Sequence, residues 1–277
     1  MDKTDQFLVY DSDQQRSTAL EEIRAIFHYR YLVVQFVRRD LLTRYKRSVL
    51  GVAWTMLNPL GTMIILTIVF SRVFGASHEG YPVYVLSGLV AWNFFSQSTN
   101  AATLHLVWGG SLLRRIYMPR TSFAVSATGT GLVNFVLSLV PLLLVMLVTG
   151  VSIKPTIILV PIPMLFLAMF ALGLGLLIST VAVYFADIAE MYQIVLTAWM
   201  YLSPVIYSYE ILPEPYRSWL MRFNPMYHLL TLFRAVVYDG RVPDWSEFLI
   251  TGGISFVTLS VGWFVFTAKA DEFAYRV

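Results

Sequence analysis

Residues 155–186 read PTIILVPIPMLFLAMFALGLGLLISTVAVYFA, and this stretch contains no Asp, Glu, Lys or Arg. The hydrocarbon core of a bilayer is about 30 Å thick, so a helix of about 20 apolar residues crosses it. Other stretches also lack charged residues: 50–70, 121–153, 191–209 and 248–268. A soluble fold with these runs would expose large apolar patches. The pattern therefore predicts an all-α integral membrane protein.

The composition agrees with this prediction and excludes several kinds of site. Charged residues make up 13% of the chain, whereas soluble domains carry about 25%. The basic residues cluster at the ends of apolar segments, so we expect no nucleic-acid binding. The chain has no cysteine, no phosphate-binding loop motif and no histidines at metal-ligand spacing. We therefore expect no catalytic residue, metal or cofactor in this chain.

Six membrane-spanning helices are predicted, at 50–70, 83–106, 123–148, 157–183, 191–207 and 248–267. Before them, residues 1–22 are predicted to be a flexible extension. Apolar residues recur at helical spacing within 23–48: Val34, Val37, Leu41 and Tyr45. This segment is predicted to be an amphipathic helix at the membrane surface, with a basic polar face. Its basic residues also serve as a topology signal, and residues 49–277 form the transmembrane domain.

Basic residues mark the cytoplasmic side of a membrane protein. The segment from Lys3 to Arg47 holds nine of the twenty, and the first and third loops hold one each. With six spans, the N-terminal segment, the second and fourth loops and the C-terminal tail share one side. Both termini are therefore predicted to be cytoplasmic.

The fifth loop, 208–247, is an exception because it lies outside and yet holds four arginines. Long loops follow the charge rule only weakly. Two short apolar stretches, 216–223 and 226–237, are separated by Asn224 and Pro225. Neither is long enough to span, so we predict a hairpin of two short helices dipping into the outer face. A hairpin on the surface is the alternative.

The second span has one polar face, on which Asn93, Ser96, Asn100 and Thr103 are spaced by three, four and three residues. Such a face must contact protein or water. It indicates either hydrogen bonds between helices or the lining of a translocation path. Nearby aromatic residues suit sugar rings, although most membrane proteins have interfacial aromatic belts. The candidate channel residues are Trp92, Asn93, Phe95, Ser96, Asn100, Trp199, Tyr201 and Tyr207. The glycines Gly173 and Gly175 are predicted to mark close helix contacts.

Several motifs, in order, resemble the permease subunit of ABC-2 type polysaccharide exporters, the group that exports O-antigen, teichoic acid and capsule. RDL at 39–41, RYKRSVLG at 44–51, Trp54 and NP at 58–59 resemble the entry into the first span of that family. The later matches are LRRIYMPR at 113–120, YFADI at 184–188, LSPVIY at 202–207, NPM at 224–226 and FR at 233–234. The family commonly has Arg where this chain has Ala186.

This resemblance implies a homodimer with two copies of a separate ATPase subunit, which would hold the ATP and Mg²⁺. It implies a channel for a lipid-linked glycan at the dimer centre, in the cytoplasmic (inner) membrane of a bacterium. The chain has neither a phosphate-binding loop nor a buried ionisable relay, so a partner must supply the driving force. The candidate ATPase-coupling residues are Arg39, Arg44, Arg114, Arg115, Pro119, Arg120, Asp187 and Glu190.

Two other functions are open at this point. One is ABC-2 export of a drug or lipid, and the other is a membrane enzyme or scaffold acting on lipid-linked sugars. The lack of charged residues deep within the predicted spans disfavours the enzyme, because intramembrane chemistry usually needs ionisable groups there.

Overall fold

The computed structural model describes residues 19–73, 80–108 and 119–276, and these residues form helices and connecting turns without a strand. The prediction of an all-α fold is confirmed for this part of the chain. The helices that correspond to the predicted spans are α3 (Ala53–Val73), α4 (Tyr81–Trp108), α6 (Thr121–Thr149), α7 (Pro161–Tyr184), α8 (Ile188–Leu202) and α11 (Trp245–Arg276). The other described helices are α1 (Ala19–His28), α2 (Arg30–Tyr45), α9 (Glu214–Phe223) and α10 (Pro225–Val237), with 3₁₀ turns at Pro155–Leu159 and Tyr209–Ile211.

Four helical segments in the described residues are long and apolar enough to cross a membrane: Ala53–Phe70, Thr121–Thr149, Pro155–Tyr184 and Trp245–Ala270. They correspond to the first, third, fourth and sixth predicted spans. The other two predicted spans are α4, which has 28 residues, and α8, which has 15. The polar residues of α4 lower its overall hydrophobicity. Helix α8 is about 22 Å long at 1.5 Å per residue, which is shorter than the hydrocarbon core of about 30 Å. Crossing by these two helices stays a prediction.

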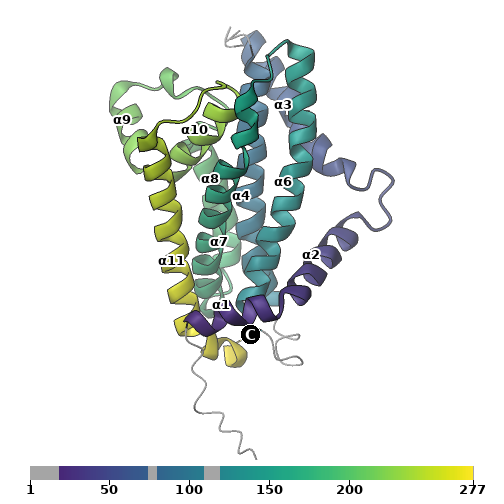
Figure 1. Ribbon diagram of the computed structural model, residues 1–277, viewed down its shortest axis with the longest axis vertical. Coiled ribbons are helices and arrows are strands. Elements are labelled where there is room, and N and C mark those ends of the chain that lie inside the picture. Colours follow the sequence, from purple (N-terminus) through teal and green to yellow (C-terminus); the bar gives the residue numbers. More distant parts are fainter. Residues whose placement is uncertain (1–18, 74–79, 109–118, 277) are drawn as a thin grey trace, which may run out of the picture.

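The bundle is built around α4, which lies between α6 and α7, and α11 covers the other side of α7 (Figure 1). Glycines allow α7 and α11 to approach closely. A Cβ on Gly173 would lie 2.5 Å from the Cα of Leu259, and one on Gly262 would overlap the Gly173 carbonyl. A Cβ on Gly175 would lie 3.1 Å from the Ala102 side chain of α4. The predicted close contacts at Gly173 and Gly175 are confirmed.

The N-terminal region differs from the prediction of one helix over 23–48. It begins at Ala19 and breaks at Tyr29 into α1 and α2; residues 1–18 lie outside the described residues. On α2 the buried residue is Phe36, at 7% exposure, whereas Val34 is 59% exposed. The Phe36 ring stacks on Phe123 of α6 with centroids 5.7 Å apart, so contact with α6 decides which face of α2 is packed.

The N-terminal helices and the end of α11 lie at one end of the bundle, and α9 and α10 lie at the other (Figure 1). The Trp263 indole N–H of α11 donates to the Ala19 carbonyl, 3.0 Å away. From α1, α2 rises obliquely outward along the side of the bundle that holds α6. Its side chains therefore reach α4 and α6 at more than one level along their length.

The predicted hairpin is present as α9 and α10, joined at Asn224. The Asn224 side chain caps α10 by accepting a hydrogen bond from the Met226 backbone N–H, and Pro225 occupies the first turn, both common at helix starts. The two helices differ in burial, because α9 buries only Leu220 whereas most of α10 is buried. Thus α10 belongs to the core, and α9 alone lies on the surface.

Side chains pair with the backbone carbonyls that follow α8, where the chain leaves the helix. Asn224 donates to the Leu202 carbonyl, and Tyr81 and Tyr84 donate to those of Ile206 and Tyr207. The guanidinium of Arg234 donates to the carbonyls of Pro204 and Val205, at 2.5 and 2.7 Å, and the Ser203 carbonyl accepts from the Val205 backbone N–H. Non-helical backbone is tolerated at membrane depth only where protein satisfies its polar groups. The motif at 202–207 therefore depends on donors from α4 and α10.

Arg234 also explains why the fifth loop is basic. It is buried at 6% exposure, and its guanidinium stacks on Tyr84 at 3.6 Å. Arg241 forms a two-pronged ion pair with Glu247 at 2.6 and 2.7 Å. This hydrogen bond raises the pKa of Arg241 above its ordinary value. Two of the loop's four arginines thus have structural roles.

Candidate functional site

The polar face of α4 opens into grooves on both of its sides, and Gln97 lies on the wall of each. Toward α8, a groove of about 270 Å³ is lined by Trp92, Ser96, Gln97, Asn100, Gln193, Leu196, Thr197 and Met200. Toward α2, α3 and α6 lie two adjoining cavities that share four lining residues: Arg44, Gln97, Gly131 and Asn134. We call these two spaces together the Arg44 cavity.

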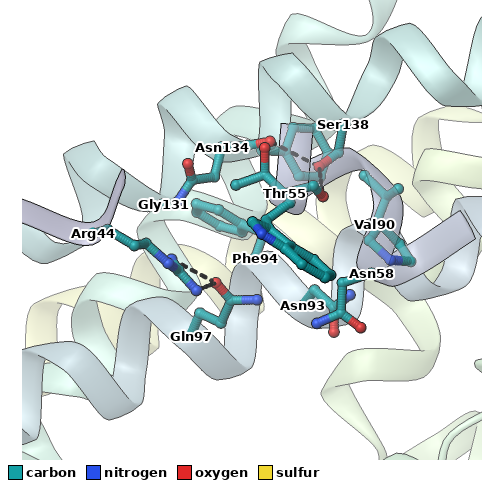
Figure 2. Close-up of a pocket in the computed structure, with 13 residues that line it drawn as sticks. Arg44, Thr55, Asn58, Val90, Asn93, Phe94, Gln97, Gly131, Asn134 and Ser138 are labelled. Atoms are coloured by element: carbon teal, nitrogen blue, oxygen red, sulfur yellow. Dashed lines mark hydrogen bonds between the residues drawn. The ribbon is translucent and has the colours of Figure 1, made fainter. Parts of the chain in front are cut away.

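The first part of the Arg44 cavity has a volume of about 130 Å³ and is shown in Figure 2. Its polar lining comes from four helices: Arg44, Thr55, Asn58, Asn93, Gln97, Asn134 and Ser138. Both terminal nitrogens of Arg44 donate to the Gln97 side-chain oxygen at 3.1 Å. This contact joins the end of α2 to the polar face of α4, and nothing in the sequence pattern predicted that pairing.

The second part has a volume of about 330 Å³ and lies beneath α2. Four polar atoms on its wall are buried and lack a hydrogen-bond partner in the described structure: Asp40 Oδ2, Ser98 Oγ, His105 Nδ1 and Thr130 Oγ1. The Asp40 and His105 atoms are 3.8 Å apart. Unpartnered buried polar atoms are rare in folded proteins, so their grouping in one cavity marks it as a candidate site.

The predicted channel residues fall into three groups. Asn93 lines the Arg44 cavity, and Trp92, Ser96 and Asn100 line the groove toward α8. The remaining predicted residues line neither space as described. Phe95 is fully buried, with its ring centroid 5.3 Å from that of Trp199.

The aromatic residues of α8 have distinct environments. Trp199 is half-buried and donates its indole N–H to the Asn224 side chain, 3.0 Å away. Its ring also packs against Trp92, with centroids 6.3 Å apart. Tyr201 is 59% exposed, and its carbonyl accepts a hydrogen bond from the Tyr207 hydroxyl at 3.0 Å. The helix α8 thus presents Tyr201 outward and uses Trp199 to hold the start of α10.

The predicted ATPase-coupling residues lie partly outside the described structure, because Arg114 and Arg115 are not among the described residues. Pro119 is buried and Arg120 half-buried at the start of α6, whereas Asp187 and Glu190 are exposed at the start of α8. On α2, Arg39 is exposed and pairs with its neighbour Asp40 at 3.1 Å, while Arg44 points into the cavity. The end of the bundle that holds α1 therefore gathers Pro119, Arg120, Asp187 and Glu190 from separate helices.

Two carboxylates at this end were missed by the sequence reasoning. Glu22 of α1 is buried at 6% exposure and accepts a hydrogen bond from Thr121 at 2.7 Å, where a helix N-terminus favours negative charge. Glu272 of α11 accepts one from Tyr184 at 2.5 Å. These contacts tie α1 and α11 to the ends of the second and fourth loops. A Glu on an otherwise apolar helix face was the only available signal for Glu22.

Residues 31–238 match the ABC-2 type transporter family, which is most of the chain. The chain belongs to this family. The O-antigen export system permease protein RfbA of Myxococcus xanthus is 32% identical to this ABC-2 chain over 260 residues, covering 92% of the chain and 98% of that relative. The polysialic acid transport protein KpsM of Escherichia coli is 23% identical over 237 residues, covering 84% and 91%.

A third relative of this ABC-2 chain is the capsule polysaccharide export inner-membrane protein CtrC of Neisseria meningitidis, 24% identical over 216 residues, with 76% and 80% covered. The resemblance stated from the motifs is therefore confirmed. Two of those motifs have a structural role: within 202–207 the carbonyls of Pro204 and Val205 are bound by Arg234, and Asn224 caps α10. The relatives' names describe transport rather than catalysis, in agreement with a non-enzymatic subunit.

Proposed function

We propose that this chain is the membrane permease subunit of an ATP-driven exporter that moves a lipid-linked polysaccharide across the bacterial inner membrane. The observation that carries the proposal is the match to a named O-antigen export permease over 98% of that relative's length. The capsule and polysialic acid relatives extend the same substrate class. Export of a drug or lipid is the nearest alternative, and none of these relatives favours it.

The exporter needs a partner that hydrolyses ATP, and we propose a homodimer of this chain with two ATPase subunits. Support comes from family membership and from the absence of a phosphate-binding motif in the sequence. The ATPase would dock at the end of the bundle that holds α1, the start of α6 and the start of α8. The second loop carries arginines and the fourth loop carries acids, and opposite charges fix the orientation of a partner.

Deleting the gene is expected to trap the glycan inside the cell, because the polymer is made but not exported. Immunostaining of intact and permeabilised cells would measure this. The ATPase is expected to co-purify with the tagged wild-type chain, and Arg114→Glu with Arg115→Glu is expected to release it or uncouple its ATP hydrolysis. Normal surface glycan in the deletion strain would overturn the proposed function. Normal export by a correctly inserted double variant would reduce these arginines to topology signals.

We further propose six spans, with both termini cytoplasmic and α9 in the outer leaflet. The placement of α1 and the end of α11 opposite α9 supports an even number of crossings (Figure 1). The exposed aromatic residues Tyr216, Trp219 and Phe223 on α9 suit the membrane interface.

A single cysteine at Ser218 is expected to react with an impermeant maleimide from outside the cell and not from the cytoplasm. The assay is clean because the native chain has no cysteine. Ser17→Cys, in the N-terminal segment, provides the opposite control and should react only in inverted vesicles. Labelling of the Ser218 variant from the cytoplasmic side alone would reverse the topology.

A further inference from the structure

The Arg44 cavity places a charged side chain beside the middle of two long helices. Asp40 lies next to His105, and one turn later Arg44 reaches Gln97. His105 and Gln97 are eight residues apart on α4, which corresponds to about 12 Å along the helix. Arg44, which is exposed in the single chain, thus meets α4 well away from the end of the bundle. The polar groups that line the space beside it mark it as a candidate binding site.

The cavity is large enough for more than a few ordered water molecules. Its two parts measure about 130 and 330 Å³, whereas one water takes up about 30 Å³ in the liquid. The larger part alone reaches the lower limit of roughly 300 Å³ that is typical of small-molecule pockets. The space therefore suits a ligand the size of one ring.

The carboxamide and hydroxyl groups of the lining suit a ligand that both donates and accepts hydrogen bonds. Asn58 and Asn93 present carboxamides, which do both, to the first part of the cavity. In the second part, Ser98 and Thr130 hydroxyls have no partner in the described structure. A buried polar atom that is left unpaired destabilises the structure. Hydroxyl groups on a ligand would satisfy amides and hydroxyls alike.

The charges on the wall favour a neutral ligand over a phosphate. Arg44 and Asp40 both line the second part of the cavity. One oxygen of Asp40 pairs with Arg39, and the other, Oδ2, is the buried atom on the cavity wall. An anion that approached Arg44 would also meet the Asp40 carboxylate. The first part adds three aromatic side chains, Trp54, Phe94 and Phe135, whose faces suit the apolar C–H surface of a ring.

We propose that the Arg44 cavity binds one neutral, hydroxyl-rich ring, the chemistry of a single sugar residue. If the chain exports a glycan, as proposed above, this sugar belongs to the exported polymer. Gln97 forms a wall shared with the groove between α4 and α8. A sugar bound by Gln97 competes with Arg44 for its amide, so occupancy of the cavity loosens the contact between α2 and α4.

Two buried serines provide a matched test in a chain without native cysteine. Ser138 lines the cavity at 8% exposure, and Ser179 is fully buried in α7. Each hydroxyl donates to the carbonyl four residues earlier, at 2.8 and 2.6 Å. Ser138→Cys and Ser179→Cys would be made in the full chain, in lipid nanodiscs, and labelled with a small methanethiosulfonate.

The Ser138→Cys thiol is expected to react at least about tenfold faster than the Ser179→Cys thiol, because accessible thiols react and buried ones are inert. Neutral hexoses and N-acetylhexosamines are expected to slow this labelling, and inorganic phosphate is not. Adding Asn93→Leu should abolish protection by sugar while labelling persists.

Three results would overturn the proposal. Labelling that no hexose or N-acetylhexosamine slows indicates a cavity that holds water only. Slowing by phosphate alone indicates an anion site, and equal inertness of both cysteines indicates a closed space. The assay requires neither ATPase nor export, so failure here leaves the proposed function standing. Sugar protection in a chain whose deletion traps no glycan would support the site and reject the export function.

Discussion

Replacing Arg234 with methionine is expected to destabilise the protein by several kcal/mol, because each buried acceptor left without its donor costs about 1–3 kcal/mol. Methionine fills much of the same volume but cannot donate, so the carbonyls of Pro204 and Val205 lose their partners. Tyr84 also loses both a hydrogen bond of 2.8 Å and the stacked guanidinium. The non-helical segment after α8 would then contain unsatisfied carbonyls at the end of the bundle that holds α10.

The measurement is the thermal unfolding midpoint of the purified chain in nanodiscs, together with the yield of folded protein. Arg222→Met is the matched control, because Arg222 lies exposed on α9 of the same hairpin and its loss should leave the midpoint unchanged. Arg234→Lys should be nearly as damaging as Arg234→Met, because an ammonium cannot reproduce the planar fork of donors. A wild-type midpoint for Arg234→Met would show that this network contributes nothing to stability.

Glycine at position 88 belongs to the same network. A Cβ on Gly88 would overlap the Val205 carbonyl and the Arg234 guanidinium. The three elements, α4, α10 and the segment after α8, therefore meet at a point where no side chain fits on α4. This close approach lets one guanidinium reach two successive carbonyls.

Export is expected to fall by at least about tenfold when Asn93 and Asn100 are both replaced by leucine, since one lost hydrogen bond of about 1.4 kcal/mol has that effect on a rate. The two side chains face different spaces, because Asn93 lines the Arg44 cavity and Asn100 the groove toward α8. Both are half-buried, so leucine fits without overfilling the core. Glycan at the cell surface, normalised to the amount of assembled permease, provides the measurement.

This double variant separates the two interpretations of the polar face of α4. If Asn93 and Asn100 line the path, the variant assembles normally and binds its ATPase. If they instead hold helices together, size-exclusion chromatography will show loss of folded dimer. Thr99 provides the comparison for a packing role, because it is buried and accepts a hydrogen bond from Tyr192 of α8 at 2.7 Å. Thr99→Val is expected to lower stability, and export is expected to fall only in proportion to the loss of folded protein.

Part of the candidate site followed from sequence spacing and part did not. The three- and four-residue spacing of Asn93, Ser96 and Asn100 predicted a polar face on α4, and that face does line grooves. The aromatic residues were harder to place, because hydrophobic rings favour both a sugar path and a packed core. Phe95 proved to be fully buried, which only its neighbours on α7 and α8 decide.

Local sequence determined the helices themselves. An uncharged run that crosses a bilayer must be helical, because lipid offers no hydrogen-bond partners to its backbone groups. The run at 155–186 accordingly forms the helical segment Pro155–Tyr184. Asn224 and Pro225 cap and start α10 by contacts within two residues, so the hairpin was predictable. Gly173 gave the close contact with α11 because only glycine lets two backbones approach that far.

Tertiary structure alone decided how distant residues meet. Arg234 and Tyr84 are 150 residues apart in the sequence, Glu22 and Thr121 are 99 apart, and Arg44 and Gln97 are 53 apart. Nothing in the local pattern distinguishes Arg234 from an exposed arginine, because its partners are backbone carbonyls, which every residue carries. The same applies to α2, whose buried face is Phe36 rather than Val34. Apolar periodicity shows that a helix has a face to bury, but the neighbour that covers it determines which face that is.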